Sequence, residues 1–217
     1  MPFLIETIIF AVVVYLITAI LNRLYRKDSP ALPAFPWGPW VFGHLIVGAL
    51  FGSLTSAFQG TIFGGIGNWA LLGASIGIMQ WIVLRDRTPV SNFWAVSSTL
   101  GWSVFAIFQT LHFPGSLDWF LTGILVGTLQ WFCFKERTWV TAWWILSNGF
   151  AWLVGGFLGV HGSLVLLQGI QNPIFSVLLG WGITGLVVGL ILGISMVKMK
   201  QIPGDPVTGD PKEAAGE

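Results

Sequence analysis

Residues 69–81 read Trp69-Ala-Leu-Leu-Gly73-Ala-Ser-Ile-Gly77-Ile-Met-Gln80-Trp81, and residues 119–131 read Trp119-Phe-Leu-Thr-Gly123-Ile-Leu-Val-Gly127-Thr-Leu-Gln130-Trp131. From 69 to 104, thirteen of the 36 positions are identical to the positions 50 residues further on. A period of this length is typical of an array of one supersecondary unit. We therefore expect a tandem repeat of one helical hairpin, with copies at 69–118 and 119–168.

A degenerate third copy begins at Trp181. Gly185 and Gly189 match the two glycines of residues 69–81, whereas Leu192 and Gly193 replace the Gln-Trp pair. A looser alignment concerns the apolar stretch from 39. If Trp40 is set beside the tryptophans at 94 and 144, His44 aligns with the residues at 98 and 148.

The composition indicates an integral membrane protein. Charged residues are 9% of the chain and hydrophobic residues 54%, whereas a soluble domain carries about 25% charge. Seven apolar stretches approach the roughly 20 residues that a membrane-spanning helix needs. They are 3–21, 39–58, 66–84, 89–110, 117–134, 139–160 and 175–197. We therefore expect an all-α, polytopic membrane helix bundle with about seven transmembrane helices, forming a single domain over 1–200.

The basic residues predict the orientation of the bundle. With seven spans, all ten Lys and Arg residues fall on one side of the membrane. The positive-inside rule makes that side cytoplasmic, with the N-terminus outside and the C-terminus inside. Residues 201–217 are rich in Pro, Gly and acidic residues, which predicts a flexible cytoplasmic tail. The net charge of +1 predicts no nucleic-acid partner.

A stripe of small residues predicts how the helices pack. Trp69, Gly73, Gly77 and Gln80 recur at spacings of four, four and three, so they share one helical face. Small residues at this spacing let helix backbones approach closely. The stripe predicts packing within the chain, with a homodimer face as the alternative.

A few polar residues lie inside the predicted spans, at similar depth in the cytoplasmic half. They are Ser97 and Ser147, together with the candidate ligand-binding residues His44, Gln80, Ser98, Gln130 and Asn148. One interpretation is a set of hydrogen bonds that join helices. The other is a ligand-binding site in which His44 supplies an axial or hydrogen-bonding group. No cofactor is predicted on the first interpretation, and a tetrapyrrole or carotenoid is the cofactor that the second would take.

Two further groups of residues lie near the predicted cytoplasmic boundary. Arg85, Arg87, Lys135 and Arg137 flank the hairpin turns, where they anchor the topology or hold anionic lipid headgroups. Several tryptophans lie close by, as expected of an interfacial belt. They are Trp37, Trp40, Trp139, Trp143 and Trp144.

Catalytic and metal-binding motifs are missing from the sequence. We find no Gly-x-Ser-x-Gly, His-Glu-x-x-His or P-loop pattern. No charged residue is predicted near a bilayer midplane, where ion-coupled transporters and pumps need one. Cys133 is the single cysteine, so neither an intrachain disulfide nor a cysteine metal cluster is expected. We predict that the protein is not an enzyme and holds no metal.

The pattern Gln80-Trp81-x-x-Leu84-Arg85, followed by Trp94 and then Gly101-Trp102, resembles repeats of uncharacterised polytopic membrane proteins of bacteria, often cyanobacteria. The resemblance covers residues 66–160. The second copy departs from it, with Phe134-Lys135 for Leu-Arg and Ala151 for Gly. It implies a bacterial inner or thylakoid membrane and transfers no functional residue.

These observations predict a non-catalytic accessory or assembly subunit of a bacterial membrane complex. The alternative is a module that binds or transports an apolar ligand, pigment or lipid between the helical repeats. The expected partners are membrane lipids, with other membrane protein subunits or a homo-oligomer.

Overall fold

The computed structural model describes residues 35–57, 65–85, 88, 90–111, 117–134, 139–166 and 172–201. The predicted span at 3–21 and the predicted tail after Gln201 lie outside this part of the chain. The regular secondary structure of the described residues is helical, with one isolated bridge between Val90 and Phe134, so the predicted all-α class is confirmed for them. The elements are α2 (Trp37–Val47), the π-helical η1 (Gly48–Gly52), α3 (Ser53–Ala57), α4 (Ile66–Leu84), α5 (Trp94–Thr110), α6 (Leu117–Trp131), α7 (Trp139–Leu166) and α8 (Pro173–Gln201).

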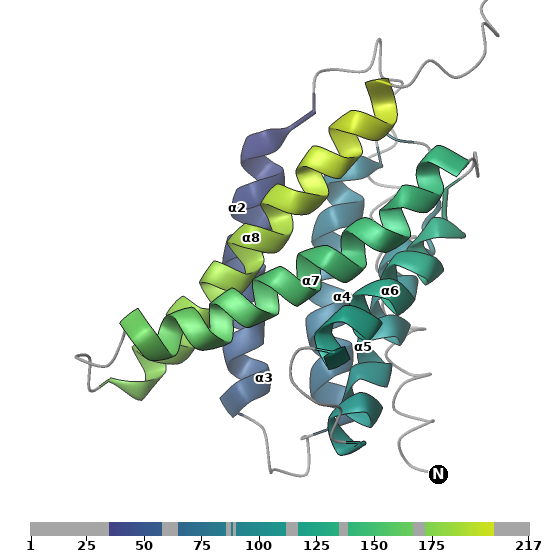
Figure 1. The fold of residues 1–217 in the computed structure, drawn as a ribbon. Coiled ribbons are helices and arrows are strands. Elements are labelled where there is room, and N and C mark those ends of the chain that lie inside the picture. The colour runs from purple at the N-terminus through teal and green to yellow at the C-terminus, as the bar shows by residue number, and fades with distance from the viewer. Residues whose placement is uncertain are drawn as a thin grey trace, which may run out of the picture.

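The helices pack into one bundle (Figure 1), and their contacts close it into a ring. Going round it, α2 contacts α4, α4 contacts α5, α5 contacts α6, α6 contacts α7 and α7 contacts α8. The last helix then returns to the first, because α8 contacts α2, η1 and α3. Each helix therefore has two neighbours, and one face of each points into the ring.

Glycines allow the closest of these contacts. A Cβ atom on Gly77 of α4 would lie 2.8 Å from the Cα of Ala95 on α5. A Cβ on Gly127 of α6 would lie 2.9 Å from the Cα of Ile145 on α7. The glycine stripe predicted from the sequence thus packs against a neighbouring helix of the same chain, as expected where small residues bring backbones together.

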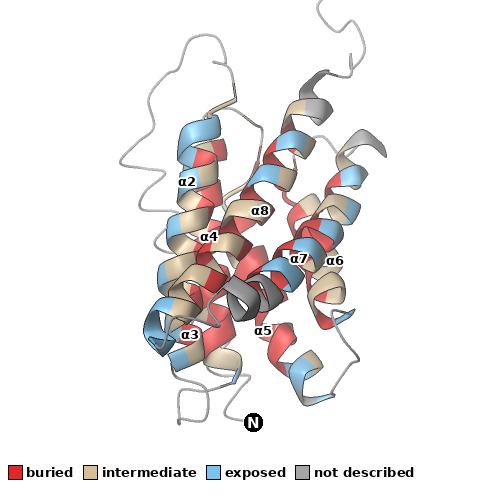
Figure 2. Cartoon of the chain, turned by 60° about the vertical axis from the view of Figure 1, so that its left-hand side comes forward, coloured by how far each residue is buried: buried red, intermediate tan, exposed pale blue. Residues whose placement is uncertain are grey.

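Large apolar residues are exposed on the outside of the ring, and several polar residues are buried inside it. Figure 2 shows buried and exposed residues on the same helices. Phe42, Ile46 and Leu50 form one exposed stripe along α2 and η1, with Phe42 64% exposed. Gln80 and Gln130, in contrast, are buried. This is the reverse of a soluble protein, in which uncharged polar groups favour the surface. It suits hydrocarbon, which cannot hydrogen-bond to a polar side chain.

Three of the described helices are long and apolar enough to cross a membrane. They are Trp37–Ala57, Ile66–Leu84 and Pro173–Val197. With the exposed apolar perimeter, they are consistent with an integral membrane protein.

One predicted helix boundary is wrong. The span expected from residue 89 begins as a helix only at Trp94. Val90 instead bridges to Phe134, and the Ser91 N–H donates to the Cys133 carbonyl over 2.8 Å. These extended residues tie the segment after α4 to the end of α6, and apolar content alone cannot distinguish such a pairing from a first helical turn.

Candidate functional site

Four of the five candidate ligand-binding residues join in one hydrogen-bond network inside the ring. His44 comes from α2, Gln80 from α4, Ser98 from α5 and Gln130 from α6. All four are at least 98% buried. Residues far apart in the chain meet here because each lies on the inward face of its helix.

Gln80 is the centre of the network. Its Nε2 donates to His44 Nε2 over 3.0 Å. Its Oε1 accepts from Trp94 Nε1 over 3.0 Å and from Gln130 Nε2 over 2.9 Å. One amide therefore joins α2, α4, α5 and α6.

Gln130 repeats part of this arrangement. Its Nε2 also donates to Ser98 Oγ over 2.7 Å. Its Oε1 accepts from Trp144 Nε1 over 2.9 Å, which extends the network to α7. The side-chain oxygen of each glutamine thus accepts a hydrogen bond from an indole. The side-chain nitrogen of Gln80 donates to α2, and that of Gln130 donates to α4 and α5.

The hydrogen bonds of His44 fix its tautomer. Nδ1 lies 2.8 Å from the Trp40 carbonyl oxygen, which can only accept, so Nδ1 carries the proton. Nε2 then accepts from the Gln80 amide. Both ring nitrogens are engaged within the protein, and an axial ligand to a metal or tetrapyrrole would have to break the bond to Gln80.

Asn148 lies beside the network but does not bond to the other four residues. Its Nδ2 donates to the Trp144 carbonyl over 3.0 Å. Its Oδ1 is buried and has no hydrogen-bond partner among the described residues. A buried, unsatisfied amide oxygen is uncommon in a folded protein.

Three tryptophans belong to this layer and were not expected in it. Trp40, Trp94 and Trp144 are fully buried, and each donates its indole N–H to an interior acceptor. The prediction that Trp40 and Trp144 form an interfacial belt is therefore wrong. For two of them a sequence pattern indicates a place in the layer, because Trp94 follows Gln80 and Trp144 follows Gln130 at the same separation of 14 residues.

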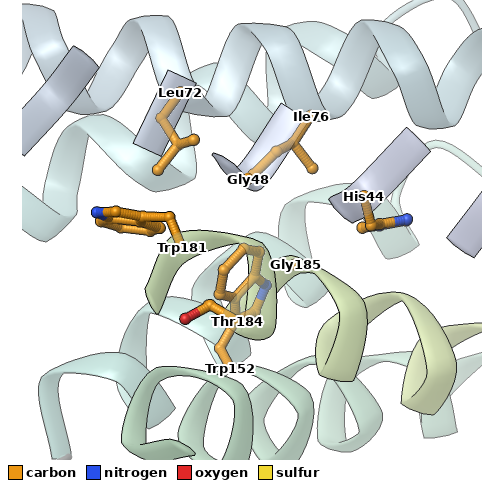
Figure 3. Close-up of a pocket in the computed structure, with 8 residues that line it drawn as sticks. All are labelled: His44, Gly48, Leu72, Ile76, Trp152, Trp181, Thr184 and Gly185. Atoms are coloured by element: carbon orange, nitrogen blue, oxygen red, sulfur yellow. The ribbon is translucent and has the colours of Figure 1, made fainter. Parts of the chain in front are cut away.

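A small cavity adjoins the network (Figure 3). It has a volume of about 10 Å³, which is about the space of one water molecule. Its lining residues are His44, Gly48, Leu72, Ile76, Trp152, Trp181, Thr184 and Gly185. The cavity is far too small for a tetrapyrrole or a carotenoid.

Of the four residues predicted to bind lipid headgroups, only Arg85 lies in the described part of the chain. The Arg85 guanidinium lies 5.2 Å from the centroid of the Trp81 ring, at cation–π distance. Arg87, Lys135 and Arg137 lie outside the described residues. Within the described part of the chain, no group of three or more His, Cys, Asp or Glu residues could hold a metal ion.

Comparisons of the chain with known protein families, curated proteins and solved structures find no match. The resemblance to bacterial repeat membrane proteins therefore stays a prediction.

Proposed function

We propose that this chain is a non-catalytic membrane protein that serves as an accessory or assembly subunit of a bacterial membrane complex. The observation that carries the proposal is the reversed burial pattern, with large apolar side chains outside and paired polar side chains inside. A ring built this way has a lipid-facing surface and an interior occupied by its own hydrogen bonds.

The geometry of the interior favours a structural role over transport. The amide groups of the two glutamines are occupied by hydrogen bonds to indoles and to side chains of neighbouring helices. The cavity beside the network has a volume of about 10 Å³. A transport pathway needs polar or charged groups that face a space which a solute can enter. The layer is better suited to fixing how the helices pack.

The proposed topology has about seven spans, with a 50-residue hairpin repeat, the N-terminus outside and the C-terminus in the cytoplasm. Support comes from the identical residues of the two copies and the one-sided basic residues. Arg85, Arg87, Lys135 and Arg137 would then flank the cytoplasmic turns and meet the anionic headgroups of membrane lipids.

Affinity purification tests the proposed role. The tagged full chain is extracted from its native membrane in mild detergent, and proteins and small molecules in the sample are identified by mass spectrometry. We expect a membrane protein partner at a fixed ratio that an unrelated tagged polytopic protein does not capture. A chain that purifies alone with a stoichiometric chromophore or lipid would contradict the proposal.

An open groove favours a second function, the binding of an apolar ligand or lipid. The groove has a volume of about 330 Å³ and lies on the seam between α2, η1 and α8. It is lined by Leu45, Ala49, Phe175, Leu178, Leu179, Gly182, Ile183 and Leu186. No side chain in this lining is polar, so a ligand held there would be recognised by its apolar surface.

Filling the groove tests this second function. Gly182→Leu adds an apolar side chain inside the groove, and Gly38→Leu adds the same side chain at a position with nothing within 4 Å of the new Cβ. Loss of a co-purifying lipid or pigment in Gly182→Leu alone, at an unchanged melting temperature, would favour ligand binding. An unchanged small-molecule content would reject the groove as a ligand site.

A further inference from the structure

Three pairs of neighbouring helices share one packing contact. In the first pair, α4 and α5, two glycines of α4 face a single residue of α5. A Cβ on Gly73 would lie 2.6 Å from the Ser98 carbonyl oxygen, and a Cβ on Gly77 would lie 2.7 Å from the Ser98 Cβ. Ser98 therefore marks the point of closest approach of the two helices.

The same contact recurs in the pair α6–α7. A Cβ on Gly123 would collide with the Asn148 carbonyl oxygen, and a Cβ on Gly127 would lie 2.9 Å from the Asn148 Cβ. Asn148 takes the place of Ser98.

It recurs once more between the last helix and the first described one. A Cβ on Gly185 of α8 would collide with the His44 carbonyl oxygen of α2, and a Cβ on Gly189 would lie 3.0 Å from the His44 Cβ. His44 takes the same place as Ser98 and Asn148. In this pair, however, the helix with the glycines follows its partner helix in the chain instead of preceding it.

Hydrogen bonds repeat with the packing. Each of these three residues donates its side chain to the carbonyl of a tryptophan four residues earlier, at 2.8–3.1 Å. The pairs are Ser98–Trp94, Asn148–Trp144 and His44–Trp40. A side-chain bond to the preceding turn is common in helices, but its recurrence at the closest approach of all three pairs indicates equivalent positions.

The indole of each tryptophan then bonds to the partner helix. Trp94 donates to Gln80, and Trp144 donates to Gln130. Trp40 donates instead to the Gly189 carbonyl over 2.9 Å. The position of α8 equivalent to the two glutamines is Leu192, which cannot accept a hydrogen bond.

The links between pairs also follow one direction round the ring. Gln130 of the second pair donates to Ser98 of the first pair, and Gln80 of the first pair donates to His44 of the third pair. The next step would run from residue 192 of the third pair to Asn148 of the second. Leu192 has no amide to donate, and the Asn148 Oδ1 is a buried oxygen without a partner among the described residues.

We infer that the ring consists of three equivalent helix pairs about a pseudo-threefold axis, and that the third pair is split between the first and the last of the described helices, α2 and α8. The end of α8 and the start of α2 lie at the same end of the bundle (Figure 1), as the two helices of a hairpin require. Leu192 stands at the position of a third glutamine, which would accept from Trp40 and donate to Asn148.

The substitution Leu192→Gln tests whether residue 192 occupies the position of a third glutamine. Leu192 and Leu72 are both fully buried, so a glutamine at either position carries the same desolvation cost. We expect Leu192→Gln to melt in detergent at the temperature of the unchanged protein or about 2–4 °C above it, because the new amide supplies a donor to the unpaired Asn148 Oδ1, while the Trp40 N–H exchanges the Gly189 carbonyl for the glutamine oxygen. Leu72→Gln should melt lower.

Combining Leu192→Gln with a second substitution tests each of its two expected hydrogen bonds. In Asn148→Ala or Trp40→Phe proteins, adding Leu192→Gln should lower the melting temperature, because one of the two partners is missing. A Leu192→Gln protein that melts as low as Leu72→Gln, or whose effect is the same in all backgrounds, would overturn the inference.

Cross-linking tests the split pair without depending on stability. A Cβ on Gly182 would lie 3.7 Å from the Ala49 Cβ, a separation typical of disulfides. The double variant Ala49→Cys, Gly182→Cys should form an intramolecular disulfide on oxidation, seen by a gel shift. The control is Ala49→Cys with Gly101→Cys, because among the described helices α5 makes no contact with η1. Equal cross-linking of both double variants, or of neither, would contradict the pairing of α8 with α2 and η1.

Discussion

Gln80 and His44 are joined by a hydrogen bond of 3.0 Å between their Nε2 atoms, across the seam between α4 and α2. The bond brings the first described helix into a network that otherwise runs through α4, α5, α6 and α7. Its direction is fixed, since the amide nitrogen can only donate. The consequences of breaking it can therefore be predicted for each partner.

Gln80→Leu and His44→Leu should be coupled in their effects on stability. Each substitution removes the same bond, so the double variant should lose less free energy of unfolding than the sum of the two single variants. We expect each single variant to lose under about 2 kcal/mol, because hydrogen bonds between membrane helices average ~0.6 kcal/mol and Gln80 makes three. Reversible unfolding in detergent measures the cycle, and strict additivity would mean that the bond does not form.

Gly77→Leu and Gly127→Leu should each destabilise the bundle by more than about 1–3 kcal/mol, the usual cost of overpacking a core. A Cβ at either position would lie within 3 Å of the backbone of the neighbouring helix, so the helices would have to separate. Gly38→Leu is the matched control, because nothing lies within 4 Å of its Cβ position. Melting temperatures equal to that of Gly38→Leu would show that the helix pairs are packed differently.

The helical class and the polar layer could be predicted from the sequence, because both follow from local patterns. The length of the apolar stretches predicted the helices. The recurrence of Gln80 as Gln130 predicted that two residues of the network lie at one depth. Helix boundaries were less predictable. The segment before Trp94 carries no charge and runs directly into the apolar residues of α5, but Ser91 pairs with Cys133 in the tertiary structure.

The inward orientation of Trp40 and Trp144 was missed for a different reason. Trp40 and Trp144 lie near the ends of their predicted spans, where an exposed ring at the membrane interface is the usual outcome. Whether such a ring points outward or inward depends on the helix rotation, which is set by the glycine contacts between helices. Trp143 shows how fine the distinction is, since it is 56% exposed while its neighbour Trp144 is fully buried.

Trp40→Phe should therefore destabilise the protein, whereas Trp143→Phe should not. Trp40 loses its bond to the Gly189 carbonyl, and the smaller ring leaves a gap in the core. We expect a loss of about 1–3 kcal/mol for Trp40→Phe and less than about 0.5 kcal/mol for Trp143→Phe. Intrinsic fluorescence provides a second measurement, because removing the buried indole should leave the quenchable fraction higher.

The proposed orientation predicts which residues can be labelled from each side of the membrane. With Cys133 changed to Ser, a cysteine at Gly162 should react with an impermeant reagent added outside intact cells. Cysteines at Asp86 and Glu136 should react only after the membrane is opened, because the basic turns are expected in the cytoplasm. Labelling of either turn from outside would exclude the seven-span topology.

His44→Leu, measured for stability and bound small molecules together, distinguishes the two interpretations of the polar layer. If the layer only joins helices, the variant should melt a few degrees lower, because the Gln80 amide and the Trp40 carbonyl lose their partner. Its absorption spectrum and lipid content should equal those of the unchanged protein. His44→Asn is the matched control, because Asn148 makes the equivalent bond to its own tryptophan carbonyl and an asparagine at 44 should keep most of the stability. A chromophore or lipid that disappears from His44→Leu while the melting temperature stays unchanged would instead make the layer a ligand-binding site.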